Sequence, residues 1–560
     1  RFKKENLIII ILAFNIIMSR NFETVTKSIN SVRNTIYSPG DVIEIDVPAT
    51  DVAVINPRGT KLKFNVQMVG SNVCSQPDGT AGCWSLIKTL QIFDLNTNTL
   101  LEQIDECNHL VSMMKHYSKT PSIVNNWELQ HGQCANSTPS SLYYTQQGLV
   151  GQVQNNIVEC VVDLQVSGLL KQSAPLLPNI LIGGIRIRIT LEDVARSIVT
   201  YPCAQLLPPA DVTPYDVNTR YPDVWAQGCG GGISAAAVAG SPAPPPNSYF
   251  DVKTALPAAA QTTIVLDNTI ASPAIPFDRT NNCQIKVGQR LLVWDAATAV
   301  TQVLGAVTAV TDLGGALGLQ VTFVNTVLTT ALAVNDRCWI DVSSLTTTYQ
   351  VSNLELLVSS AEMGTEDLRS MVDKSSTTGG MNVDYKSWNL YRDNLQALVS
   401  NPQVTLDCTE RRALSLVQLP YNPNAVLGQE RPPMRTINDE GINYSYTIAN
   451  RNTPSRPVPI DRVSSNVALA FDAIQGLEVE KAVERCDVMP RFMCNNNNYF
   501  MIGRALSRKE HSFNANANNI RLSILYSTAA TANLTNKVLE SFMYHIRRLN
   551  ISNGAVRVTY

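Results

Sequence analysis

Residues 185–191 read IRIRITL, and this short stretch carries the pattern that decides the fold. Three isoleucines alternate there with Arg186, Arg188 and Thr190. Successive side chains of a β-strand point to opposite faces, so the stretch predicts a strand with one apolar face in a core. The polar face is then left for solvent or for an interface.

The same period of two recurs along most of the chain. Residues 41–48 read DVIEIDVP and residues 62–69 read LKFNVQMV, both with alternating apolar side chains. Further predicted strands, rich in Val, Ile and Thr, are 86–93, 157–166, 349–358, 403–407, 413–419, 499–504, 520–526 and 556–560. Helical spacing is confined to 99–117 and 464–484, whereas 536–549 fits helix or strand, with strand favoured at its end. The pattern predicts a mainly β protein with short helices in its loops.

Composition adds that the chain is long, apolar and nearly neutral. Its 560 residues exceed one ordinary domain. Only 16% are charged, against about 25% in typical proteins, which suits flanks buried by neighbours. The 44 Lys and Arg against 46 Asp and Glu leave no basic excess for a broad nucleic-acid face, so specific nucleic-acid binding is not expected.

The N-terminal segment is apolar but short. Residues 7–18 read LIIIILAFNIIM, which is fewer than the roughly 20 residues that span a bilayer. We interpret residues 1–17 as upstream sequence before a start at Met18, with a signal-like or membrane-touching segment as the alternative. Residues 18–40 are then expected to form a polar N-terminal arm.

The middle of the chain differs from its flanks. Residues 203–342 contain no Glu, and a proline cluster at 242–246 follows a glycine run at 228–232. Short predicted strands come next, at 263–266, 290–294, 299–310, 319–323 and 337–342. These features predict a small β-barrel inserted in a surface loop, where a longer loop costs little more to close. A second break, at 364–382, divides the rest into two β-rich halves.

Motifs for chemistry are scarce. The GCGGG run lacks the strand-turn-helix context of a phosphate loop, and GxxxxGK[ST], GxSxG, HExxH and CxxC are absent. His109 and His116 lie seven residues apart near Cys107, but this is not metal-ligand spacing, and packing or surface roles are favoured. No catalytic, cofactor-binding or metal-ligating residue is assigned, and no cofactor is expected.

The other polar clusters are interpreted as groups on the protein surface. The adjacent acids Asp105–Glu106, Glu366–Asp367 and Asp439–Glu440 are the only candidates considered for a glycosidase pair. The basic residues at 504–509 and 547–548 suit rim or interface ion pairs. Glycosylation sequons occur at Asn136, Asn443, Asn533 and Asn550 and matter only on a secretory route. The twelve cysteines are predicted to be mostly free and buried, with a few disulfides as the alternative.

The order of several segments resembles that in the double jelly-roll major capsid proteins of polinton-like viruses, adintoviruses and virophages. In the first half these segments are WSLIKTLQIFD (84–94), LLEQIDECNHLVSMM (100–114), PLLPNILIGGIRIRITLEDVARSI (175–198) and YQVSNLELLVSSAEM (349–363). In the second half they are TERRALSLVQLPY (409–421), SRPVPID (455–461), YFMIGRALS (499–507) and FMYHIRRLNISNGAVRVTY (542–560). The resemblance spans 38–202 and 347–560 and leaves out 203–346.

This resemblance implies two consecutive eight-stranded jelly-roll β-sandwiches. The first would comprise 41–202 plus 347–380, the second 381–560, and 203–346 would be an inserted β-barrel tower. The implied function is that of a non-enzymatic major capsid protein whose homotrimers form pseudo-hexameric capsomers of an icosahedral DNA-virus shell, assembled inside the host cell. The implied partners are neighbouring capsomers and minor capsid and penton proteins, with an inner membrane left open as a contact of the arm.

Two other functions remain open. A secreted or surface β-sandwich adhesin would use residues 1–17 as a signal peptide and would carry disulfides and sugars. A carbohydrate-active enzyme on a jelly roll would need a cleft with paired carboxylates.

Overall fold

The computed structural model describes residues 24–118, 157–171, 183–201, 250–267, 288–340, 347–421, 436–461, 468–477, 500–506, 512–527 and 536–559, apart from short gaps within these ranges. Residues 1–17 and the glycine run 228–232 therefore lie outside the described part. Among the described helices, none is both long and apolar enough to span a membrane.

The first half of the chain forms a sandwich of two antiparallel sheets. One sheet has the order β1-β19-β5-β9 and the other the order β3-β10-β7-β8. Their bounds are β1 (Thr24–Asn30), β3 (Val42–Pro48), β5 (Lys61–Gly70), β7 (Ile87–Asp94), β8 (Leu100–Ile104), β9 (Ile157–Asp163), β10 (Gly184–Leu191) and β19 (Thr347–Glu362). The short strands β2 (Ile36–Tyr37) and β4 (Ala53–Ile55) pair with β19, and β6 (Cys74–Pro77) pairs with β11 (Ile198–Tyr201).

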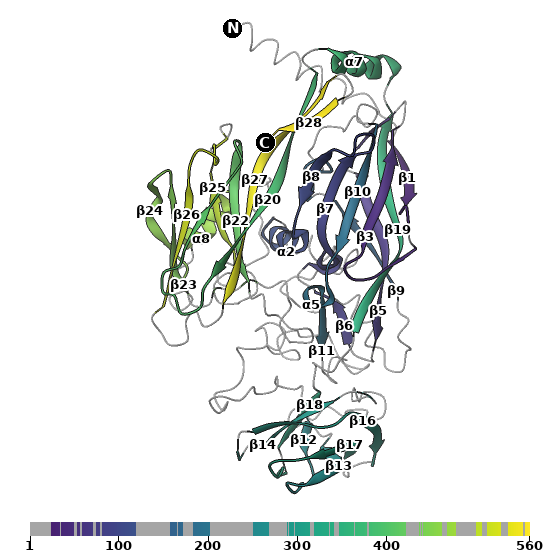
Figure 1. Ribbon diagram of the computed structural model, residues 1–560, viewed down its shortest axis with the longest axis vertical. Helices are drawn as coiled ribbons and strands as arrows, with labels where there is room; N and C mark the ends of the chain where they lie inside the picture. The colour runs from purple at the N-terminus through teal and green to yellow at the C-terminus, as the bar shows by residue number, and fades with distance from the viewer. Residues whose placement is uncertain are drawn as a thin grey trace, which may run out of the picture.

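The second half forms another sandwich beside the first (Figure 1). Its sheets have the orders β20-β27-β22-β25 and β21-β26-β23-β24, and β28 extends the end of β27. Their bounds are β20 (Met381–Leu395), β21 (Gln403–Leu406), β22 (Ala413–Tyr421), β23 (Gly441–Ile448), β24 (Arg451–Pro459), β25 (Ile502–Ala505), β26 (Ile520–Tyr526), β27 (Lys537–Ser552) and β28 (Ala555–Thr559).

The two sandwiches share one topology. When the eight main strands of each are lettered B to I in chain order, both give B-I-D-G in one sheet and C-H-E-F in the other. Two four-stranded sheets connected in this way are a jelly roll. The predicted pair of consecutive eight-stranded jelly rolls is confirmed, and we call them the first roll and the second roll.

The core follows the alternation seen in the sequence. Ile185, Ile187 and Ile189 are buried, whereas Arg186 and Arg188 are half-buried on the other face. One hydrophobic cluster runs through both rolls. In the second roll all nine residues of β22 are buried. A strand with both faces covered needs apolar or hydrogen-bonded side chains throughout, and β22 reads ALSLVQLPY.

One predicted helix needed a correction. Residues 100–104 of the expected helix 99–117 form β8, and the helix α2 covers only Cys107–Ser118. Residues 536–549, left open between helix and strand, lie almost wholly in β27, which confirms the strand favoured at their end. In both stretches the apolar residues fit either period, and pairing with a neighbouring strand decides between them. The expected helix 464–484 is present as α8 (Ala468–Gln475).

Within the described residues, three other short helices connect the strands. The 3-10 helix η2 (Gly82–Leu86) precedes β7, and α5 (Val194–Ser197) follows β10. The break at 364–382 contains the helix α7 (Thr365–Ser376), which links the two rolls at one end of the molecule (Figure 1).

The predicted N-terminal arm is wrong for part of its length. Residues 24–30 form β1, the B strand of the first roll, in register with β19 from Thr24 opposite Ala361 to Asn30 opposite Glu355. The arm was expected because residues 19–40 are polar, with Arg20, Lys27 and Arg33 against Glu23. An edge strand with solvent on one side tolerates such a sequence, so its partner strand determines the structure.

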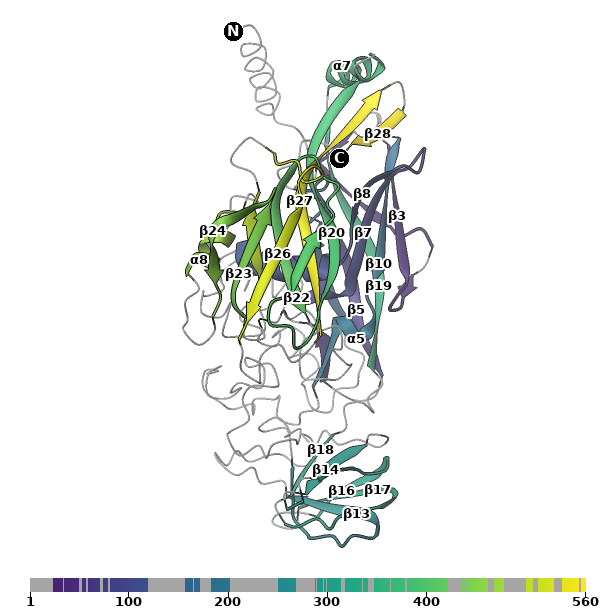
Figure 2. The same ribbon diagram turned by 60° about the vertical axis from the view of Figure 1, so that its left-hand side comes forward.

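The inserted segment lies between strands H and I of the first roll. It contains a seven-stranded antiparallel sheet in the order β15-β14-β18-β12-β13-β17-β16. The bounds are β12 (Phe250–Val252), β13 (Ala260–Asp267), β14 (Leu291–Asp295), β15 (Val300–Val303), β16 (Val307–Asp312), β17 (Leu319–Val327) and β18 (Arg337–Ile340). It has its own hydrophobic cluster and lies at the end of the molecule opposite α7 (Figure 2). Closure into a barrel and the limits 203–346 stay predictions.

Among the described cysteines, one pair forms a disulfide instead of the expected free thiols. Cys83 of η2 is bonded to Cys160 of β9, and both are buried. Cys107, Cys338 and Cys408 are free and buried, as expected.

Candidate functional site

The described contacts between the two rolls form one continuous seam. Strand β8, the F strand of the first roll, lies against β20, the B strand of the second roll. The Tyr385 hydroxyl of β20 donates a hydrogen bond to the Leu101 carbonyl of β8. Helix α2, in the F–G connection of the first roll, lies between the two sandwiches (Figure 1). The seam therefore joins the F strand β8 and the helix α2 of the first roll to the sheet of the second roll that begins at its B strand, β20.

The turn from β8 into α2 positions the polar groups of the seam. Glu106 sits in this turn with a left-handed φ of 49°, which costs a non-glycine residue about 1–2 kcal/mol. The turn places the Glu106 carboxylate and, one helical turn later, the His109 ring at the second roll. Strained backbone persists where surrounding contacts over-determine it. Here ion pairs to Arg196 and Arg392 hold the Glu106 carboxylate.

An ionic cluster with a buried centre crosses the seam at this point. His109 Nδ1 lies 2.7 Å from Glu540 Oε2, and Arg392 Nη2 lies 2.9 Å from Glu540 Oε1. Arg196 Nη2 lies 2.9 Å from Glu106 Oε2. Glu106, His109 and Glu540 are all buried. We call these five residues the seam cluster.

Neighbouring groups complete the seam cluster. Arg196 Nη1 also lies 3.7 Å from Glu192, which accepts a 2.9 Å hydrogen bond from the Asn108 side chain. The His109 ring meets the Tyr421 ring edge-on, with centroids 4.7 Å apart. Aromatic edge contacts and hydrogen-bonded ion pairs are both strongest in one defined geometry. The cluster therefore fixes how the rolls sit relative to each other.

The electrostatics of the seam cluster are those of paired ions. Burial raises the pKa of the Glu540 carboxyl, but His109 and Arg392 outweigh burial and hold this pKa below its ordinary value. Burial alone would lower the pKa of the Arg196 guanidinium, yet the nearby glutamates raise it. Both groups are therefore charged at neutral pH.

The donors of the seam cluster do not favour a metal ion. One ligand atom from each of Glu106, His109 and Glu540 lies within 4.8 Å of the others. However, both carboxylates are already paired with Arg392. A divalent cation would have to displace a guanidinium and would then face its positive charge at close range. Ion pairing between the rolls is the chemistry that this arrangement supports.

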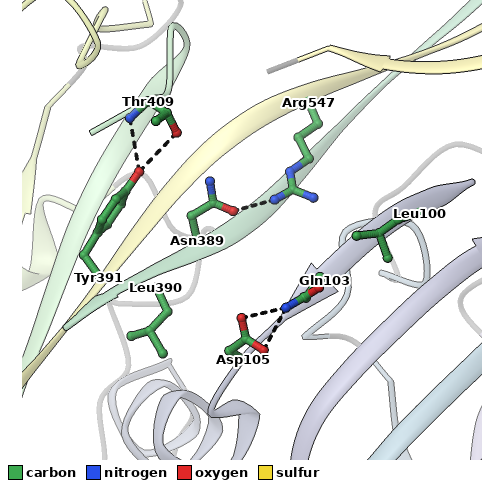
Figure 3. A pocket seen from close by; sticks show the side chains of 8 residues that line it. All are labelled: Leu100, Gln103, Asp105, Asn389, Leu390, Tyr391, Thr409 and Arg547. Carbon is green, nitrogen blue, oxygen red and sulfur yellow. Dashed lines mark hydrogen bonds between the residues drawn. The ribbon is translucent and has the colours of Figure 1, made fainter. Parts of the chain in front are cut away.

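A cleft of about 340 Å³ lies along the same seam (Figure 3). It is lined by residues of both rolls: Leu100, Gln103, Asp105, Asn389, Leu390, Tyr391, Thr409 and Arg547. The amide of Gln103 donates to Asp105 at 2.9 Å on one wall. On the other wall Arg547 donates to the Asn389 carbonyl oxygen. Polar lining groups thus form hydrogen bonds with one another within each wall of the cleft.

The residues considered from sequence are dispersed by the fold. Asp105 lines the cleft while Glu106 enters the seam cluster, so this acid pair diverges. Glu366 and Asp367 lie in the first turn of α7. Asp439 and Glu440, like the sequons at Asn136 and Asn533, lie outside the described residues.

Of the histidines considered, only His109 joins a cluster. Cys107 donates to the Ile104 carbonyl instead of facing His109, and the His116 side chain lies outside the described part. Arg547 is buried and donates hydrogen bonds to His545 and Asn389, whereas Arg548 forms the expected kind of ion pair, with its Nε 2.7 Å from Asp384. Arg504 lies in β25.

Sequence reasoning missed Arg196, Arg392 and Glu540. Each looks like an ordinary charged residue in its own segment. The available signal was that Glu540 stands in an apolar run, KVLESFMYHI, where a charge needs a partner.

Comparisons with known proteins concern the whole chain. No family model and no curated protein matches the sequence. Among solved structures, the chain is similar to the PBCV-1 virus capsid at 9% identity, covering 97% of this chain and 98% of that chain, with a TM-score of 0.45. It is similar to the Faustovirus major capsid protein at 8% identity, covering 95% and 91%, with a TM-score of 0.45. The mavirus major capsid protein is 7% identical, covering 98% and 94%, with a TM-score of 0.35.

Proposed function

We propose that this chain is the major capsid protein of an icosahedral virus, with a structural rather than a catalytic role. One observation carries the proposal. The chain contains two jelly rolls of identical topology, held side by side by a buried seam. A single sandwich is enough to present the loops of an enzyme or a binding module. A subunit of a closed shell gains from a second sandwich, because two similar sandwiches in each chain give the assembled capsomer a more regular outline.

Geometry links the double roll to shell building. Three copies arranged in a closed ring place six similar sandwiches around one axis, which gives a nearly hexagonal outline from threefold symmetry. Hexagonal outlines pack without gaps on the faces of an icosahedral shell. Homotrimeric capsomers in the virion shell are therefore the proposed assembly, with neighbouring capsomers and penton and minor capsid proteins as partners.

The two ends of the molecule fit two faces of a shell. The inserted sheet lies at one end and α7 at the other, beyond the sandwiches (Figure 2). An insertion with its own hydrophobic cluster can project without disturbing the rolls. We assign it to the outer face as a tower, which leaves the end with α7 and β28 to face the interior.

The test is the solution mass of the full chain, measured by light scattering after gel filtration. A stable species of three chains with a hexagonal outline in electron micrographs is the expected result. A chain that stays monomeric up to about 100 μM, far above ordinary trimer dissociation constants, would overturn the proposal.

One observation favours a second candidate, an extracellular adhesin. The Cys83–Cys160 disulfide is typical of oxidising compartments. The described sequons speak against this candidate, because Asn443 lies within β23 and Asn550 bonds Asn382 across strands. A monomer that carries sugars after secretion would favour the adhesin over the capsid protein.

A further inference from the structure

The disulfide of the first roll joins a short helix to the opposite sheet. Cys83 lies in η2, within the connection from strand D to strand E, and Cys160 lies in the G strand, β9. Both residues are completely buried. The two ends of the bond are held differently, because β9 pairs with β5 along its whole length, whereas η2 is a short 3-10 helix outside the sheets.

The helix η2 contacts the element that holds Arg196 of the seam cluster. The Ser85 hydroxyl of η2 donates a 3.0 Å hydrogen bond to the carbonyl of Ser197, the last residue of α5. The Leu86 carbonyl, at the end of η2, accepts a 2.9 Å hydrogen bond from the backbone N–H of Glu192, two residues before α5. Any movement of η2 therefore reaches α5 and its Arg196.

The helix η2 also contacts α2, the helix of His109. The Asn108 side chain donates hydrogen bonds to the Ser85 carbonyl at 3.4 Å and to Glu192 at 2.9 Å. Asn108 stands between Glu106 and His109, the two other members of the seam cluster that the first roll supplies. All five of these residues are buried. The first-roll side of the seam cluster thus rests on η2.

Reduction of the disulfide would force atoms in this region to move. Bonded sulfur atoms lie about 2 Å apart. The sulfurs of two free thiols are non-bonded atoms, for which the best separation is about 3.5–4 Å. A close-packed core has no spare volume for this difference, so one of the two elements has to shift. Because β9 is fixed in its sheet, η2 is the element that moves.

A shift of η2 changes the ion pairs that cross the seam. Its hydrogen bonds to α5 and α2 transmit the movement to Arg196 and His109. His109 pairs with the buried Glu540 of the second roll. Buried ion pairs are costly to misalign, because their charges have left water and depend on one another. The state of the bond therefore affects a contact between the rolls.

We infer that Cys83 and Cys160 form a thiol–disulfide switch that controls how tightly the two rolls are held together at the seam. With the bond formed, η2 is fixed and the seam cluster has the geometry described above. With the bond reduced, η2 shifts, the ion pairs of the seam cluster weaken, and the rolls are held less firmly.

The chemical step is an exchange with a small disulfide such as oxidised glutathione. The S–S bond of the small disulfide breaks and the bond between Cys83 and Cys160 forms. The two protein sulfurs are oxidised, the two sulfurs of the small molecule are reduced, and the two thiol protons pass to the small thiols that are released. Because both cysteines are buried, the exchange requires a transient opening of η2 and is slow in the folded chain.

A switch of this kind suits a protein that passes between two redox environments. The interior of most cells keeps thiols reduced, whereas disulfides persist outside. A capsid protein is made in the first environment and travels through the second in the released particle. The seam would then be looser during assembly and firmer in the virion. This use of the switch rests on the proposed function, whereas the switch itself does not.

The first experiment compares the full wild-type chain after oxidation with oxidised glutathione and after reduction with dithiothreitol. Intact mass after alkylation confirms the state of the bond. Hydrogen exchange in α2 and β20 is expected to be at least about tenfold faster in the reduced protein. The change should be much smaller in β3, which lies at the opposite edge of its sheet from β8. A Cys83→Ser, Cys160→Ser variant should exchange alike in both buffers, which excludes an effect of the other cysteines.

The second experiment tests whether the bond acts through the seam cluster. Urea unfolding gives the factor by which reduction lowers the folding equilibrium constant of the wild type, of Glu540→Ala and of Asp384→Ala. This factor is expected to be at least about fivefold smaller in Glu540→Ala than in the wild type, because the pairs that the shift disturbs are already lost. Asp384, which pairs with Arg548 in the second roll, is the matched control and should leave the factor unchanged.

The effect of the cross-link on the unfolded chain is the same in the three proteins and cancels in this comparison. Equal factors in all three would overturn the inference, as would equal changes of exchange in α2 and β3 or a bond that does not form with the oxidant. The hydrogen-exchange comparison decides the question even where a variant fails to fold. Neither experiment depends on the solution mass, so the inference and the proposed function can fail separately.

Discussion

His109 and Glu540 are separated by 431 residues along the chain, and their side chains meet at 2.7 Å in a buried seam. One residue belongs to the first roll and the other to the second. Buried pairs tolerate little misalignment, because a displaced charge would be left without a partner. We therefore expect the two rolls to move as one rigid body, as the proposed capsid role would require.

Removing Glu540 should loosen the rolls. Glu540→Ala leaves the buried His109 without its carboxylate and leaves Arg392 with Glu106 alone, so we expect a loss of about 3 kcal/mol in the free energy of unfolding. Urea unfolding measures it. Glu159→Ala is the control, since its exposed pair with Lys63 should be worth less than about 1 kcal/mol. Equal losses in the two variants would show that the seam cluster is not a special contact.

His545 should make the chain less stable in mild acid. Burial, aided by Arg547, lowers its pKa to about 3, well below the ordinary value of 6.5. Below pH 6.5 the unfolded chain takes up a proton that the folded chain refuses, so the free energy of unfolding should fall by about 1.4 kcal/mol per pH unit. Unfolding at pH 7, 6 and 5 measures this slope.

The variant His545→Gln tests the assignment of that slope. It removes the titrating ring, so the slope between pH 6.5 and 5 should flatten by about one proton. An unchanged slope would assign the acid sensitivity to other groups. Glu540, with its lowered pKa, loses stability only at lower pH and does not interfere in this window.

A methyl group added at Gly168 should clash with the second roll and push the two rolls apart. A Cβ there would lie 1.7 Å from the Lys386 carbonyl oxygen of the second roll. Gly168→Ala should destabilise the protein by at least about 2 kcal/mol, since backbone must move. Gly364→Ala serves as the comparison, because its nearest neighbour, Asp367, is 3.6 Å away. A Gly168→Ala protein as stable as Gly364→Ala would contradict the close approach of the rolls.

The inserted sheet should be dispensable for folding. Its hydrophobic cluster is separate from the one that runs through the rolls. Replacing residues 203–346 with a Gly/Ser linker of about ten residues should leave the rolls with a single cooperative unfolding transition at nearly the same temperature. Scanning calorimetry decides the point. A lost or strongly lowered transition would mean that the insertion stabilises the rolls.

The disulfide should stabilise the first roll. It closes a 77-residue span between Cys83 and Cys160, and such bridges are typically worth about 2–4 kcal/mol. Reducing agent should therefore lower the stability of the wild type but not of a Cys83→Ser, Cys160→Ser variant. Intact mass after alkylation without reductant would show two fewer free thiols if the bond forms, and all twelve if it does not.

The sequence predicted the strands well where one face is buried. Ile185, Ile187 and Ile189 alternate with polar residues, and no other local structure buries them together. It failed at 100–104, where Leu101 and Ile104 fit strand and helix equally well. It also failed at β1, whose exposed side chains carry no alternation. In both places the strand forms because it pairs with another strand, and the local sequence pattern contains no information about that partner.

The seam cluster was harder to predict than the fold. Glu106 was considered only as half of an acid pair, and His109 only with Cys107 and His116. Their true partners, Arg196, Arg392 and Glu540, come from other segments. Charged residues are common at surfaces, so a lone glutamate or arginine suggests solvent unless its neighbours in space are known.

In the proposed capsomer, fusion of two rolls into one chain changes the rate at which the ring of chains can form. The seam inside the chain forms during folding, at a rate that does not depend on concentration, because its partners are covalently tethered. Only the contacts between copies require collisions. Half of the roll-to-roll contacts in the proposed ring of three chains are thus complete before the first encounter, so we expect assembly to begin even in a dilute pool of newly made chains.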